Sequence, residues 1–103
     1  MNIGIDFDGV LAKHNGIPTL SEEINDLKPT EGAIDAVKYL FSLGHNVYVF
    51  TSNPNQSAIR KWLKKYNFPM IDVTNIKLAQ THVFIDDRAI RFTNWNDIRK
   101  YFG

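Results

Sequence analysis

The chain has no cysteine among its 103 residues, so disulfides, thiolate metal sites and a cysteine nucleophile are excluded. It also lacks a long apolar run: no stretch approaches the roughly 20 residues needed to span a bilayer, and we expect no membrane association. Twelve basic and eleven acidic residues leave a net charge of only +1. Because no broad positive surface follows from this balance, we expect no nucleic-acid partner.

Length and composition indicate a single soluble domain over residues 1–103. The 44% hydrophobic and 13% aromatic content is sufficient for a core. Asp6 and Asp8 interrupt the apolar start of the chain and no basic segment precedes it, which is unlike a signal peptide. We therefore expect a cytoplasmic protein.

Apolar strands alternate with amphipathic helices along the chain. Strands are expected at residues 3–6, 46–50, 70–73 and 82–85, with an edge strand at 89–92. Helices are expected from the N-cap Thr30 to the stop at Gly44, from Asn53 and Pro54 to Tyr66, and from Asp97 to Phe102, packed through Ile98, Tyr101 and Phe102. Trp62 and Trp95 are expected to be packing residues. This alternation predicts an α/β fold with a mostly parallel sheet covered on both faces.

The segment 12–28 has no sustained periodicity, although Ile24 and Leu27 are apolar enough to fix it to the core. We expect a loop or flap there. A long loop in so short a chain is often a lid or a substrate-contact segment, and a plain surface connection is an equal alternative.

Polar residues follow three of the expected strands directly, at the edge where parallel sheets bind ligands. They are Asp6 and Asp8, Thr51 and Ser52, and Asp86 and Asp87. Residues two apart in an extended chain point the same way, so Asp6 and Asp8 should share one side while Phe7 faces the core. Two such close carboxylates require a cation, a shared proton or an acid/base task. Gly9 allows the sharp bend that follows.

Four carboxylates without histidine or cysteine favour Mg²⁺, with Ca²⁺ or Mn²⁺ as alternatives. Thr51 adds a hydroxyl, the amides after it can face an anion, and Lys77 adds a positive charge. A cation, a hydroxyl, amides and a lysine together indicate a site for a phosphoryl group.

The ordered motifs resemble those of the haloacid dehalogenase (HAD) superfamily of phosphohydrolases. The motifs are Asp6-Phe7-Asp8-Gly9-Val10-Leu11, Val47-Tyr48-Val49-Phe50-Thr51, Lys77, and Val83-Phe84-Ile85-Asp86-Asp87. The resemblance covers the whole chain and implies a three-layer Rossmann-like fold. Larger members carry cap domains, but neither segment 12–28 nor segment 67–76 is long enough for one, so a capless member is implied.

The resemblance also implies roles for individual residues. Asp6 would be the nucleophile that forms an aspartyl phosphate, and Asp8 the general acid and base. Mg²⁺ would be held by Asp6, the backbone carbonyl of Asp8, Asp86 and Asp87. Phosphoryl oxygens would be held by Thr51, the Ser52 amide and Lys77.

Several alternatives stay open at this point. Lys77 matches by position only, and a solvated surface lysine is its plain alternative. Arg88 either contacts substrate or pairs with an acidic neighbour. The activity is expected to be hydrolysis of a phosphomonoester of unknown class, with phosphotransfer, mutase activity or non-catalytic binding of a metal or phospho-ligand as alternatives. Capless members often use a partner subunit as a lid, so a homo-oligomer is one expected partner.

Overall fold

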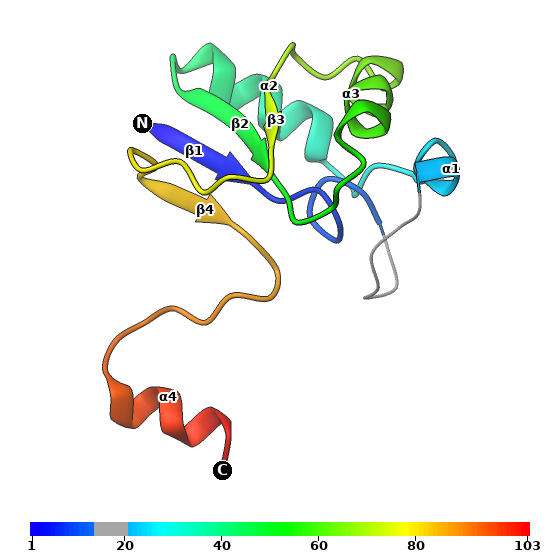
Figure 1. The fold of residues 1–103 in the computed structure, drawn as a ribbon. Coiled ribbons are helices and arrows are strands. Elements are labelled where there is room, and N and C mark those ends of the chain that lie inside the picture. The colour runs from blue at the N-terminus through cyan, green and yellow to red at the C-terminus, as the bar shows by residue number, and fades with distance from the viewer. Residues whose placement is uncertain (14–20) are drawn as a thin grey trace.

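The computed structural model describes residues 1–13 and 21–103, which form an α/β fold on one four-stranded sheet. The strand order is β3-β2-β1-β4 and every neighbouring pair is parallel (Figure 1). The elements are β1 (Asn2–Ile5), α1 (Ser21–Ile24), α2 (Ala33–Ser42), β2 (Asn46–Phe50), α3 (Gln56–Lys65), β3 (Val73–Thr74), β4 (Val83–Ile85) and α4 (Trp95–Tyr101). The predicted α/β class and parallel sheet are confirmed.

The apolar core lies between the sheet and helices α2 and α3. Helix α2 connects β1 to β2, and helix α3 connects β2 to β3, so both connections cross the sheet in the same direction. Because such connections are right-handed, both helices lie on the same face of the sheet. The buried side chains of this core include Ile3, Ile5, Val47, Val49, Ala33, Val37, Ile59, Trp62 and Leu63. Trp62 is fully buried, as expected, and its indole N–H donates to the Leu27 carbonyl at 2.9 Å. The segment after α1 is thereby tied to the core.

The opposite face of the sheet carries a small aromatic layer. Phe50 and Phe84 are in ring contact, with centroids 5.3 Å apart. Gly4 lies against Phe84 and Tyr48, and a Cβ there would approach the Phe84 ring to 2.8 Å. Among the described elements only α2 and α3 contact strands, so the expected helix cover on this second face is not seen in the described residues.

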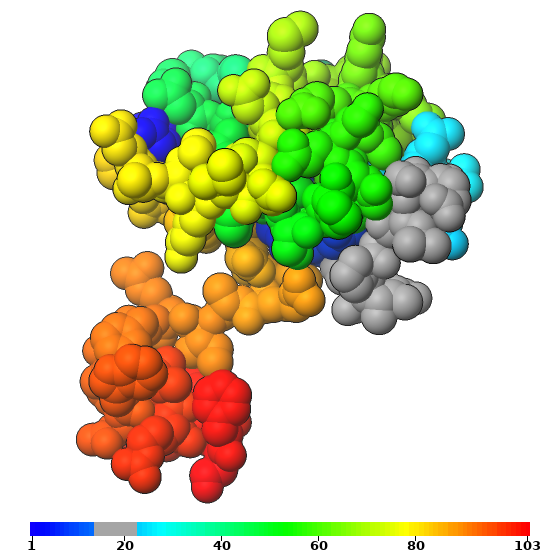
Figure 2. Space-filling model, in the orientation of Figure 1, coloured from blue at the N-terminus to red at the C-terminus, as the bar shows by residue number. Residues whose placement is uncertain are grey.

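Residues 86–103 form an arm that extends away from the body of the molecule (Figures 1 and 2). Its helix α4 contacts no other described element. The arm raises the radius of gyration to 14.6 Å, against about 13 Å for a compact chain of this length. The predicted packing of the terminal helix is therefore wrong: Tyr101 and Phe102 are exposed, and Ile98 is only half-buried. Trp95, which was expected to be a packing residue, is exposed as well. The expected edge strand at 89–92 is also wrong, because this segment is irregular.

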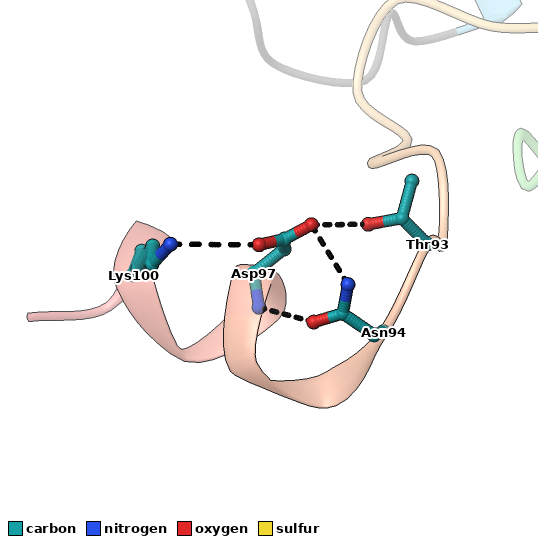
Figure 3. A network of polar contacts seen from close by, with 4 residues as sticks. All are labelled: Thr93, Asn94, Asp97 and Lys100. Carbon is teal, nitrogen blue, oxygen red and sulfur yellow. Dashed lines mark hydrogen bonds and ion pairs between the residues drawn. The ribbon is translucent and has the colours of Figure 1, made fainter.

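Local hydrogen bonds hold α4 in the absence of packing (Figure 3). The Asn94 side chain accepts from the Asp97 amide at 2.9 Å, which makes Asn94 the N-cap. The Asp97 carboxylate in turn accepts from Thr93 at 2.7 Å and pairs with Lys100 at 3.6 Å. With Asn94 as its N-cap, the helix begins at Trp95, two residues before the expected start at Asp97.

The other helix starts also differ from expectation. Helix α2 has Gly32, at φ 79°, as its N-cap, while the Thr30 hydroxyl donates to the Val10 carbonyl instead of capping. Helix α3 begins at Gln56, so Asn53 and Pro54 precede it. The predicted stop at Gly44 is confirmed by its φ of 83°.

Residues 14–20 of the expected flap lie outside the described residues. Either side of them, Ala12 and Ile24 are fully buried, so both ends of the segment are anchored. Across the described ranges, no helix has both the length and the apolar character needed to cross a membrane.

Candidate functional site

The fold places the candidate site at a reversal of strand order. The chain steps from β1 to β2 and β3, then returns to the other side of β1 to form β4. In parallel α/β sheets, the crevice beyond the carboxyl ends of the strands at such a reversal is the usual ligand site. Asp6 follows β1 and Asp86 follows β4, and the Asp6 amide donates to the Ile85 carbonyl at 2.9 Å. The two strand ends and their carboxylates therefore adjoin each other.

Three carboxylates converge there. Asp6, Asp86 and Asp87 each offer one oxygen, and these oxygens lie within 4.8 Å of one another. Asp6 is only 9% exposed, whereas Asp86 and Asp87 are open to solvent. Oxygen-only ligands at this spacing fit a hard divalent cation such as Mg²⁺. The fold therefore brings together the side chains of three of the metal ligands that the sequence predicted.

Asp6 has a strongly perturbed acidity. Burial, which disfavours the charged form, raises the pKa of its carboxyl group to about 6, and the charges of Asp86, Asp87 and Asp8 add to the rise. The Phe7 amide donates to Asp6 Oδ1 at 2.8 Å and opposes it. The neighbouring negative charges make the ionised form of Asp6 unfavourable. A cation bound among the three carboxylates would replace this repulsion with attraction.

A tight turn carries Asp8 away from this cluster. The Phe7 carbonyl accepts from the amides of Leu11 and Ala12, each at 3.0 Å. Gly9, at φ 82°, supplies the left-handed conformation that the turn needs, as predicted. Phe7 is fully buried, with its ring edge-on to Trp62 at 5.0 Å, which confirms that it faces the core.

The Asp8 carboxylate contacts the loop that follows β2 and is not one of the three clustered carboxylates. It is 8% exposed, and its Oδ2 accepts from the side-chain amide of Asn53 at 3.2 Å. The backbone amide of Asn53 donates to Thr51 Oγ1 at 3.1 Å. Because the Thr51 oxygen accepts this bond, its own hydroxyl proton can be donated to another group. Asp8 and Thr51 are thus joined through Asn53.

The remaining site candidates are exposed. Ser52 follows Thr51 at the strand end. Lys77 places its ammonium over the Phe84 ring, 5.0 Å from the centroid, on the face that carries the aromatic layer. The Arg88 amide donates to Asp86 Oδ1 at 2.8 Å, which orients that carboxylate from within its own loop. Among the described contacts, Lys77 is not joined to the acidic cluster.

Sequence reasoning missed Asn53, which it assigned to a helix start. A usable signal was present: Asn53 lies two residues after Thr51, as Asp8 lies two residues after Asp6. The alternation that paired the aspartates also predicts that Thr51 and Asn53 share a side.

The fold and the site define an α/β protein with a candidate centre for a hard divalent cation. Comparison with protein-family models gave no match for this chain, and comparison with curated proteins gave none either.

Proposed function

We propose that this protein is a Mg²⁺-dependent phosphomonoester hydrolase that works through an aspartyl phosphate on Asp6. The observation that carries the proposal is the convergence of Asp6, Asp86 and Asp87 at the reversal of strand order. A divalent cation would relieve the repulsion among these three carboxylates, and one of them, Asp6, is nearly buried with a raised pKa. This is the environment of a reacting group rather than of solvated surface charge.

The cation would be held by Asp6, Asp86 and Asp87, with the Asp8 carbonyl added on the resemblance to HAD phosphohydrolases. When bound, Mg²⁺ would offset the negative charge of the phosphoryl group and of the carboxylates. The donor set fits it, since carboxylate and carbonyl oxygens are the ligands that Mg²⁺ prefers.

The reaction has two displacements. A carboxylate oxygen of Asp6 bonds to phosphorus as the ester P–O bond breaks, and Asp8 gives its proton to the departing oxygen. A water molecule then attacks phosphorus as the bond to Asp6 breaks, and Asp8 takes a proton from that water. Thr51, Ser52 and Lys77 would hold the phosphoryl oxygens, and Lys77 would have to leave the Phe84 ring to do so.

Solvent access favours hydrolysis over phosphotransfer. Asp86, Asp87 and Arg88 are exposed, so water reaches the rim of the site freely.

The proposal also includes a capless, HAD-like three-layer arrangement. Arg88 would contact the substrate, and a second subunit would act as a lid. Helices α1 and α4 are the described helices without a strand contact, and α4 contacts no other described element at all.

The test is phosphate release from an aryl phosphate by metal-stripped protein, before and after Mg²⁺ is added. We expect turnover with Mg²⁺ only, and its loss in Asp6→Asn. The matched control is Asp26→Asn, which removes an exposed carboxylate and should leave turnover unchanged.

Three outcomes separate the alternatives. Transfer to an added alcohol in preference to water would identify a phosphotransferase. A beryllofluoride adduct on Asp6 without any turnover would identify a non-catalytic binding module. Inert protein across sugar phosphates, nucleotides and phosphopeptides, with Mg²⁺ bound, would refute the enzymatic proposal.

A further inference from the structure

Asn53 occupies the junction between the two halves of the site. It follows β2, is 1% exposed, and is buried beside the Asp8 carboxylate. Its backbone amide reaches Thr51, and its side chain reaches Asp8. One residue therefore contacts both the proposed phosphate ligand and the proposed acid/base group, although the two come from different strands.

The hydrogen bonds fix which end of the Asn53 amide faces Asp8. The Asn55 amide N–H donates to Asn53 Oδ1 at 3.0 Å, so the oxygen is the acceptor of a local turn. The Nδ2 group is then the end directed at Asp8 Oδ2. Nδ2 is a donor only, as a carboxylate partner requires.

These contacts explain why asparagine stands at this position. The turn to Asn55 needs only a side-chain oxygen, which aspartate or serine would supply as well. The contact to Thr51 comes from the backbone, which any residue but proline supplies. The amide supplies this oxygen and a separate Nδ2 donor on one side chain, and within the described residues Nδ2 contacts Asp8.

We propose that Asn53 is a positioning residue that holds the Asp8 carboxylate in the orientation needed for proton transfer to and from the substrate. This inference rests on the proposed phosphohydrolase function and extends it to a residue in the loop after the neighbouring strand. Proton transfer by a positioned side chain typically contributes about 10²–10⁴-fold to rate, so loss of orientation has a measurable cost.

The proposal predicts a dependence on the leaving group. A nitrophenolate leaves without a proton, whereas an alkoxide needs one from Asp8. In Asn53→Ala and Asn53→Asp, kcat for an alkyl phosphate should fall about 10–100-fold with little change in KM. With an aryl phosphate, the first turnover should stay fast and the second should slow, because hydrolysis of the phosphoenzyme also needs Asp8. A burst of nitrophenol followed by a slow steady state is the expected trace.

Two variants guard against a trivial loss of folding. Asn53→Asp keeps an oxygen for the Asn55 amide but replaces the donor with a second carboxylate beside Asp8. Pro54→Ala changes the same loop at an exposed residue and should keep wild-type kinetics with both substrates. Thermal melts of every variant and Mg²⁺ titrations are recorded alongside, and Mg²⁺ affinity should not change.

A double-mutant cycle decides between positioning and a structural role. If Asn53 acts through Asp8, then Asn53→Ala should cause no further loss of kcat/KM in an Asp8→Asn background. Additive losses, or wild-type kinetics in both Asn53 variants, would overturn the inference while leaving the phosphohydrolase proposal intact. Wild-type protein that turns over neither substrate would refute the proposed function itself, and the role of Asn53 with it.

Discussion

Replacing Asp6 with asparagine should stabilise the metal-free protein at neutral pH. The pKa of Asp6 is raised from 3.8 to about 6, so the folded state holds the proton more tightly than the unfolded state. Two pKa units correspond to a loss of folding stability of at most about 3 kcal/mol. Because water screens part of the effect, the expected loss is about 1–3 kcal/mol. Asparagine has nearly the same shape and carries no charge, so Asp6→Asn removes this cost.

The pH dependence follows from the same pKa shift. Well below its unfolded pKa of 3.8, Asp6 is protonated in both states and costs nothing. Between about pH 4 and pH 6 the unfolded chain loses the proton first, so wild-type stability falls as the pH rises. Above pH 6 the cost is constant. The advantage of Asp6→Asn should therefore be small near pH 4 and complete at pH 7.5.

Urea or thermal unfolding in EDTA at pH 4, 5, 6 and 7.5 measures this effect. At pH 7.5 we expect a rise in Tm of about 5–15 °C for the variant. Asp26→Asn is the control, since an exposed carboxylate should give no such trend. Saturating Mg²⁺ should shrink or invert the difference, because the ion stabilises the wild type more. An equal or lower Tm for Asp6→Asn at pH 7.5 without metal would refute the idea that this carboxylate is held ionised against its surroundings.

Three further perturbations test the fold and the metal centre. Gly4→Ala should lower the free energy of unfolding by about 1–3 kcal/mol in urea melts, because its Cβ would approach the Phe84 ring to 2.8 Å; unchanged stability would show that the ring moves aside freely. Trp62→Phe should cost about 2–4 kcal/mol in the same assay, since it removes a buried indole and leaves the Leu27 carbonyl without that donor; a loss below about 1 kcal/mol would contradict this role for the indole. Mg²⁺ at 100 times its Kd should stabilise the wild type by about 2.7 kcal/mol, with a smaller gain at the same concentration in Asp87→Asn; an equal gain in both would remove Asp87 from the ligand set.

The sheet and one side of the site were predictable because simple periodicity governs them. Apolar β-branched runs marked the parallel strands, and the polar residues after them marked the edge where ligands bind. Phe7 faces the core and Gly9 turns the chain, as alternation and glycine conformational freedom predict. Because Asp6 and Asp86 each follow a strand of the same parallel sheet, they were expected to lie at the same edge, and β1 and β4 are neighbours.

The misplaced elements were those where tertiary contacts compete with local preference. Thr30 is a good N-cap by residue type, but its hydroxyl bonds the Val10 carbonyl across the chain. Asn53 suits a helix start, yet its amide is used by Asp8 and the helix begins at Gln56. The terminal helix has an apolar stripe that predicts packing, but periodicity does not specify which surface receives it.

The three clustered carboxylates come from two parts of the chain, the sheet and the arm that follows it. Asp6 is fixed to the buried sheet, whereas Asp86 and Asp87 begin the arm that carries α4 away from it. A cation held by all three would therefore tether the arm at its root. The coupling is reciprocal. If ion binding favours one position of the arm by a given free energy, then fixing the arm in that position favours ion binding by the same amount. A contact that fixes the arm in the ion-bound position would then raise the affinity for the cation without touching any of its ligands.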